Sequence, residues 1–174
     1  MREADKRARF ERLISPHLDA AYNLARWLTR DDHDAEDVVQ EAALRAYQFF
    51  DGFRGQDGRA WLLKIARNTC YTWLEKNRAW KPEPFDEEKH GLASPVAGPD
   101  ARLRRGEDTQ LLRRALDALP AEYREVIVLR ELEGLSYKEI AAIAAIPLGT
   151  VMSRLARARE RLQQSLIGRT DKEP

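Results

Sequence analysis

The stretch LSYKEIAAIAAIPLGTVMSRLARARERL, residues 135–162, has the clearest structural pattern in this chain. Ser136 and Glu139 have capping-box spacing, in which each side chain accepts a hydrogen bond from the backbone N–H of the other, so a helix is expected to begin there. That helix is short, and the run AIPLGT at 145–150 is typical of a turn before another helix. The pattern predicts a helix-turn-helix.

The second helix of this pair has two different faces. Apolar residues recur at steps of three and four and form one inward stripe, made of Leu148, Val151, Leu155, Ala158 and Leu162. The other face carries hydroxyls and guanidinium groups, from Thr150, Ser153, Arg154, Arg157 and Arg161. Four arginines and one glutamate between 148 and 162 give a local charge of +3. Such groups suit phosphates and guanine edges in a major groove, although an ordinary solvated basic helix would show the same stripe.

Two further segments precede the helix-turn-helix. Helical periodicity starts near Glu107, Pro120 marks the start of the next helix, and Gly134 is expected to end it. The segment 81–100 holds four of the eight prolines and five acidic residues, with almost no periodic apolar pattern. The composition predicts a disordered or extended linker, which we assign to residues 81–106, followed by a C-terminal domain over 107–170.

The N-terminal part has the periodicity of three or four helices. Apolar residues recur at helical spacing from 7 to about 30, and Pro16 favours a break, so we expect one long or kinked helix there. Asp34 is expected to cap a second helix, and a third is predicted over 59–78. Residues 1–80 should therefore form a small helical domain, and the chain as a whole belongs to the all-α class.

The second helix begins with an unusual concentration of acids, namely Asp31, Asp32, Asp34, Glu36, Asp37 and Glu41. Some acids favour a helix N-terminus through the dipole, but this number suggests a protein partner with basic or polar groups. A metal site on His33, Glu36 and Asp37 is the alternative, and it is disfavoured because no second helix supplies matching His ligands.

The third helix carries basic residues, aromatic residues and the amide Asn68. The basic residues are Arg59, Lys64, Arg67, Lys76 and Arg78, and the aromatic residues are Trp61, Tyr71 and Trp73. Such a surface could hold a single nucleic-acid strand by charge and stacking. Core aromatics with solvated charges explain the same pattern equally well.

Composition excludes little. Lys and Arg total 30 and Asp and Glu total 29, so the net charge of +1 indicates neither a nucleic-acid nor a membrane partner. The apolar fraction of 43% allows a core, and no apolar run approaches the roughly 20 residues that cross a bilayer. Cys70 is expected to be a small buried hydrophobe. We expect a cytoplasmic protein with no metal, no cofactor and no small-molecule substrate, and an enzyme is disfavoured because no nucleophile and base pair or phosphate-binding glycine loop occurs.

Five motifs together resemble the extracytoplasmic-function sigma factors, the compact two-domain members of the sigma-70 family. They are DAEDVVQEA (34–42), FRG (53–55), RAWLLKIARNT (59–69), LPAEYREVIVLRELEGLSYKEIA (119–141) and GTVMSRLARARERL (149–162). They cover nearly the whole chain in the order of that family. The resemblance implies that 1–80 is a sigma region 2 bundle and 107–170 a sigma region 4 helix-turn-helix domain.

The resemblance also implies three sets of contacts. The clamp helices of the largest subunit of core RNA polymerase would contact Asp37, Gln40, Glu41, Leu44 and Arg45. The minus-10 element of promoter DNA would contact Phe53, Arg59, Lys64, Arg67 and Asn68, with Phe53 in a base-capturing loop. The minus-35 element would contact Arg130, Thr150, Ser153, Arg154, Arg157 and Arg159.

One departure from the family concerns Met152, which stands where many relatives carry Lys or Arg, so one minus-35 contact is expected to be absent. The resemblance further implies control by an anti-sigma factor, which would hold the chain at the inner membrane if that inhibitor is membrane-bound; direct insertion of the chain is not expected. The alternative function is a sigma mimic that sequesters an anti-sigma factor without binding promoters, which should have lost its basic DNA-contacting face. An ordinary helix-turn-helix regulator would leave DAEDVVQEA unexplained.

Overall fold

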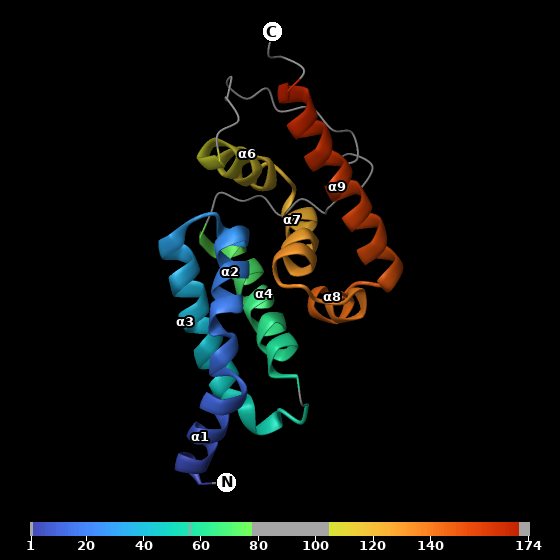
Figure 1. The fold of residues 1–174 in the computed structure, drawn as a ribbon. Coiled ribbons are helices and arrows are strands. Elements are labelled where there is room, and N and C mark those ends of the chain that lie inside the picture. The colour runs from blue at the N-terminus through green and yellow to red at the C-terminus, as the bar shows by residue number, and fades with distance from the viewer. Residues whose placement is uncertain (1, 56, 78–104, 171–174) are drawn as a thin grey trace.

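The structure is a computed structural model that describes residues 2–55, 57–77 and 105–170. Within these ranges the chain is helical and contains no strand, which confirms the all-α prediction (Figure 1). The helices are α1 (Glu3–Leu13), α2 (Leu18–Thr29), α3 (Asp32–Gln48), α4 (Gly58–Asn77), α6 (Arg105–Asp117), α7 (Ala121–Ile127), α8 (Tyr137–Ala144) and α9 (Leu148–Thr170). Short 3-10 turns occupy Ser15–His17 and Phe50–Gly52, and a π-helical turn occupies Val128–Leu132. The predicted linker, 81–106, lies outside the described residues except for its last two positions, which begin α6.

The N-terminal domain consists of α1, α2, α3 and α4. The predicted kink is confirmed, because Pro16 lies in the 3-10 turn that separates α1 from α2. The predicted cap at Asp34 is wrong. The carboxylate of Asp31 accepts a hydrogen bond of 3.0 Å from the Asp34 N–H, so α3 begins one turn earlier than expected. The acidic run offered several residues with capping chemistry, and sequence spacing alone did not distinguish them.

Close helix packing in this domain depends on small residues. The buried face of α3 includes Ala35, Ala42 and Ala46, which let α2 and α4 approach closely. Gly58 begins α4 directly against the end of α1, where an added Cβ would lie 2.2 Å from the Leu13 carbonyl oxygen. Any other residue at 58 would therefore push α4 away from α1.

The C-terminal domain begins with α6 and α7 and ends with the predicted helix-turn-helix. Pro120 is the N-cap of α7, as expected from its position, and Gly134 adopts the left-handed conformation (φ 67°) after the π-helical turn. The capping box of Ser136 and Glu139 is present with both hydrogen bonds at 3.1 Å. Ala145, also left-handed (φ 55°), ends α8 before α9 begins at Leu148.

The two domains pack directly against each other. In Figure 1, α7 lies beside α2 and α8 lies beside α4, so two helices of the C-terminal domain cover one side of the N-terminal domain. The buried apolar residues of both domains form one continuous cluster. We call this the closed arrangement.

Candidate nucleic-acid and protein interfaces

The basic face of α9 is positioned by the capped helix α8 and the turn at Ala145. Val151, Leu155 and Ala158 are buried, which fixes the rotation of α9 and turns the opposite side outward. Arg157 is exposed, whereas Thr150, Ser153 and Arg154 are partly exposed. The Ser153 hydroxyl donates to the Thr150 carbonyl at 3.1 Å, so it is held within the helix. The structure therefore brings the four predicted residues onto one accessible side of α9.

The two other predicted minus-35 residues are engaged within the domain. Arg159 donates to a carboxylate oxygen of Glu131 at 2.6 Å through Nη2 and at 3.2 Å through Nε. Arg130 donates to the Leu135 carbonyl at 2.8 Å and lies over the Tyr137 ring. Both side chains therefore already have hydrogen-bond partners, and a phosphate would have to compete with these contacts.

Met152 projects from the same region of α9 and is 53% exposed. A thioether at this position can make apolar contacts but cannot pair with a phosphate. Met152 is accessible to a partner in the closed arrangement. A charge contact at this position is therefore prevented by the uncharged side chain and not by burial.

The outward face of α3 contains the predicted polymerase-binding residues. Asp37, Gln40, Glu41 and Leu44 are exposed, and Leu44 is 68% exposed. Arg45 is partly buried and donates to Glu41 at 2.7 Å, one helical turn away. Phe49, which follows α3, is 62% exposed. Two large apolar side chains beside acids and an amide form a surface that is typical of a protein interface.

The aromatic residues at the base of the N-terminal domain form a packed cluster. Phe53 is only 3% exposed; its ring stacks on Phe50 with centroids 5.8 Å apart and lies 5.0 Å from the centroid of Trp61. In this conformation Phe53 belongs to the core and offers no free face to a base. Phe53 was predicted to lie in a base-capturing loop, and the spacing of FRG could not reveal the packing that covers its ring here.

The predicted minus-10 residues of α4 are not equivalent. Lys64 and Asn68 are exposed, and Arg59 is partly buried. Arg67 points to the other domain, where its Nε donates to Glu125 at 2.6 Å, while its Nη1 donates to the Asn68 side-chain oxygen at 3.3 Å. Arg67 is therefore occupied by a carboxylate in the closed arrangement.

Sequence analysis missed two residues of α7 that join the domains. Arg124 and Glu125 are buried, with 3% and 0% exposure, and both side chains bond to the N-terminal domain. The available signal was two adjacent charges inside the otherwise apolar run from Tyr123 to Leu129. Charged side chains are almost never fully buried unless they are paired, so such a position indicates a partner.

Cys70 is fully buried in α4, as predicted. Burial, and to a lesser degree the charge of Glu125, raises the pKa of its thiol to about 12, so the thiol is unreactive at neutral pH. Among the residues that the structure describes, no group of three or more His, Cys, Asp or Glu side chains is arranged to hold a metal ion.

No single helix in the described ranges is long and apolar enough to cross a membrane; the one pair that meets this requirement jointly, α8 with α9, is bent by 102°.

Two family models match the chain, one for each domain. Sigma-70 region 2 matches residues 13–79, and Sigma-70 region 4 matches residues 109–162. The ECF RNA polymerase sigma-E factor of Escherichia coli K12 is 39% identical over 141 residues, which cover 76% of this chain and 74% of that protein. The ECF RNA polymerase sigma factor SigE of Mycolicibacterium smegmatis is 34% identical over 162 residues, 90% of this chain but only 61% of the relative.

Solved structures give the same result. The sigma factor RpoE of Bartonella quintana, solved in complex with the anti-sigma factor NepR, matches with a TM-score of 0.69 and 31% identity over 90% of this chain and 96% of that chain. CnrH, solved in complex with the cytosolic domain of CnrY, matches with a TM-score of 0.65 and 26% identity over 91% of this chain and 88% of that chain. The likeness therefore extends over both domains.

Proposed function

This chain belongs to the extracytoplasmic-function RNA polymerase sigma factors, and we propose that α3 binds core RNA polymerase while α4 and α9 recognise the two promoter elements. Sigma factors are subunits that direct transcription initiation, and they are not enzymes. The proposed role of each helix in this chain follows from the side chains that the helix exposes.

The exposed face of α3 is the observation that supports this function most directly. Leu44 projects an apolar side chain into solvent between acids that the helix needs neither for its core nor for its cap. Apolar residues surrounded by polar ones are typical of binding hot spots. Asp37, Gln40 and Glu41 would add hydrogen bonds and charge to the clamp helices of the largest polymerase subunit.

The minus-10 element would be bound by α4 through Arg59, Lys64, Arg67 and Asn68. Lysine and arginine neutralise the DNA backbone, and the amide of Asn68 can hydrogen-bond a base edge. A base flipped out of the duplex loses a few kcal/mol of stacking, which a specific pocket must offset. Phe53 can contribute to such a pocket only if its ring leaves the aromatic cluster.

The minus-35 element would be read as duplex by α9, through Thr150, Ser153, Arg154 and Arg157. A helix with hydroxyls and arginines on its open side fits the major groove, where arginine pairs with guanine. Arg130 and Arg159 would contact phosphates after exchanging their present partners. Met152 supplies no charge, so this interface relies on fewer cations than a relative with Lys or Arg at that position.

The sigma-mimic alternative is not favoured. The relatives are named as RNA polymerase sigma factors, and the basic face of α9 retains Arg154 and Arg157. Because the similar sigma factor RpoE was solved in complex with an anti-sigma factor, we further propose that this chain is controlled by an anti-sigma factor. It would act in the cytoplasm with polymerase and DNA, and a membrane-bound inhibitor would retain it at the inner membrane.

Run-off transcription tests this function. Purified chain would be added to core polymerase with a promoter library, and the initiated templates would be sequenced. We expect initiation at defined sites that share two elements, and none with core alone. The variant Arg154→Ala with Arg157→Ala serves as a control for dependence on the minus-35 contacts. Absence of site-specific transcripts with the intact chain, in the absence of inhibitor, would contradict the proposal.

A further inference from the structure

The N-terminal end of α9 carries apolar surface on its outward side. This surface consists of Leu148, Gly149, Met152 and Ala156, which are all exposed, and we call it the α9 apolar strip. Leu148 is 49% exposed, and Met152, one helical turn further along, is 53% exposed. An added Cβ at Gly149 would meet no atom of the described residues within 4 Å, so the surface between Leu148 and Met152 is open. Contiguous exposed apolar surface of this kind indicates a contact with a partner.

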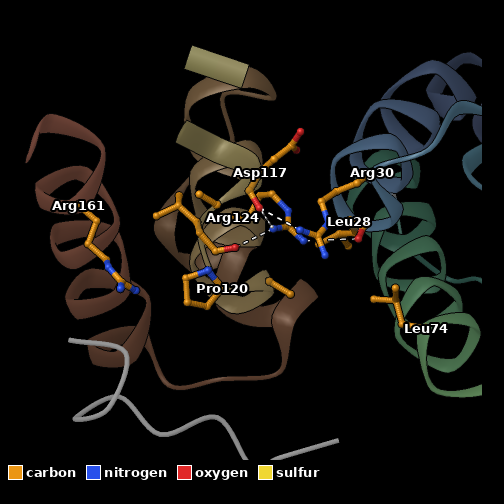
Figure 2. Close-up of a pocket in the computed structure, with 10 residues that line it drawn as sticks. Leu28, Arg30, Leu74, Asp117, Pro120, Arg124 and Arg161 are labelled. Atoms are coloured by element: carbon orange, nitrogen blue, oxygen red, sulfur yellow. Dashed lines mark hydrogen bonds between the residues drawn. The ribbon is translucent and has the colours of Figure 1, made fainter. Parts of the chain in front are cut away.

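The charge of the same helix favours duplex DNA as that partner. Residues 148–160 contain three arginines and one acid, a net charge of +2; they are Arg154, Arg157, Arg159 and Glu160. Arg161 is not counted, because it lines the pocket between the domains (Figure 2) and its guanidinium lies over the Tyr123 ring. The major groove presents thymine methyl groups between two rows of phosphates. An apolar strip on a basic helix matches that arrangement.

The position of the strip along α9 is where a recognition helix meets the bases. In a helix-turn-helix, the N-terminal residues of the second helix contact base edges in the major groove. The strip lies within the first nine residues of α9, which begins at Leu148. Among the four bases, only thymine presents a methyl group in that groove. Leu148 and Met152 offer no hydrogen-bond donor to a base, but both can pack against a methyl group.

Ser153, next to Met152 in the chain, supplies a polar group that fits the same base pair. Its hydroxyl donates to the Thr150 carbonyl at 3.1 Å, so its hydrogen is already used and its oxygen remains an acceptor. In a T·A pair, the thymine methyl group stands in the major groove beside the adenine amino group, which is a donor. An apolar side chain next to an acceptor oxygen is therefore complementary to this pair. A guanine edge carries two acceptors and matches neither group.

We propose that Met152, together with Leu148, packs against the methyl group of a thymine in the minus-35 element and makes that position selective for thymine. The inference rests on the proposed role of α9 and adds the base that residue 152 selects. A lysine or arginine at 152 would contribute charge, which attracts the DNA backbone whatever its sequence. Met152 contributes burial of apolar surface instead, which depends on the base and only weakly on salt. The residue thus exchanges general affinity for selectivity.

Removal of single methyl groups from promoter DNA tests this contact. Holoenzyme, assembled from the full-length chain and core polymerase, would be titrated with a promoter selected by the run-off experiment. Each thymine of the minus-35 element, on either strand, would be replaced in turn by uracil, which pairs in the same way and lacks only the methyl group. We expect uracil to weaken binding about fourfold at one position or at two neighbouring positions, the effect of one buried methyl group, and to change nothing elsewhere.

Substitutions in α9 assign that loss to Met152. Met152→Ala should bind the thymine and uracil promoters equally at the sensitive position. Met152→Leu, which keeps an apolar side chain of similar volume, should retain a preference for thymine of about twofold or more. Ile167→Ala truncates a 47% exposed side chain near the other end of α9 and, as the matched control, should keep the full preference. Thermal unfolding monitored by circular dichroism and association with core polymerase should be unchanged in all three variants.

The outcomes separate this inference from the proposed function. Equal binding of thymine and uracil promoters by the parent, a thymine preference that survives in Met152→Ala, or a selected minus-35 element without a T·A pair would overturn the inference and leave the proposed function standing. Weaker association of Met152→Ala with core polymerase would make the strip a protein-binding surface and would overturn the inference as well. If holoenzyme with the parent chain binds no promoter better than core alone, the proposed function is refuted, and the inference with it.

Discussion

The helices α3 and α4 are neighbours in one domain, and both carry charged surfaces, but the closed arrangement leaves the surface of α3 exposed and covers part of α4. The acidic face of α3 is open, and its Leu44 is 68% exposed, whereas Arg67 of α4 is bound to the C-terminal domain. The difference teaches that polymerase binding and minus-10 binding need not begin from the same state. If α3 binds polymerase as proposed, that contact needs no change in the closed arrangement, whereas the Arg67 side chain must leave Glu125 before it can contact DNA.

Thiol chemistry gives the largest expected contrast between the two helices. The variant Gln48→Cys places an exposed thiol at the end of α3, to be compared with native Cys70 in α4. Because the pKa of Cys70 is raised to about 12, its thiolate fraction at pH 8 is roughly a thousandfold smaller than that of an ordinary cysteine. Stopped-flow reaction with Ellman's reagent should show one fast thiol and one very slow thiol. After unfolding in guanidinium both should react at similar rates; equal rates in the folded protein would mean that α4 is not packed as described.

Removal of the α9 cations should have the next largest effect. In the variant Arg154→Ala with Arg157→Ala, each lost contact is expected to cost about 1–3 kcal/mol, so minus-35 affinity should fall at least tenfold. Fluorescence anisotropy with a minus-35 duplex measures it under one buffer condition. Association with core polymerase should be unchanged, because α3 is untouched. An unchanged affinity for DNA would show that α9 is not the minus-35 contact.

A charge at the open apolar position of α3 should weaken polymerase binding. The variant Leu44→Asp is expected to lower affinity for core about tenfold, close to 1.4 kcal/mol, because interface hot spots are intolerant of charge. Stability should change little, since Leu44 is 68% exposed. Leu112→Asp, at a 44% exposed leucine of α6, is the matched control. If both variants bind core as tightly as the parent, the α3 surface has another role.

Release of Arg159 should have the smallest effect. Arg159 and Glu131 are both about half exposed, so their ion pair contributes no more than about 1 kcal/mol. Glu131→Gln is expected to strengthen minus-35 binding about two- to threefold, because the guanidinium no longer has to leave a carboxylate. Electrophoretic mobility shift with a matched duplex measures the change. Weaker binding would indicate that Glu131 positions Arg159 for DNA.

The helices could be predicted from sequence where their signals are local. The capping box of Ser136 and Glu139 lies within one turn, and Gly134 ends a helix through its own conformation, so each pattern is complete in a few residues. The start of α3 was misplaced by one turn because Asp31 and Asp34 have the same capping chemistry. Local sequence patterns therefore predict which helices form, but they do not decide which of two chemically equivalent residues caps a helix.

The sites were less predictable because they depend on tertiary packing. The exposed faces of α3 and α9 follow from helical periodicity, since a regular apolar stripe leaves the other side to solvent. The burial of Phe53 depends on Phe50 and Trp61, which come together only in the fold. The contact of Glu125 with Arg67 joins residues 58 positions apart, and no pattern within either helix reveals it.

The two buried charges of α7, Arg124 and Glu125, should respond only weakly to ionic strength. Arg124 and Glu125 sum to zero charge and are themselves buried, so added salt screens their contacts weakly. The proposed DNA binding by α4 and α9 would release counterions and would therefore weaken steeply as salt rises. Rising salt is therefore expected to weaken the proposed DNA contacts while it leaves the contacts of Arg124 and Glu125 largely intact.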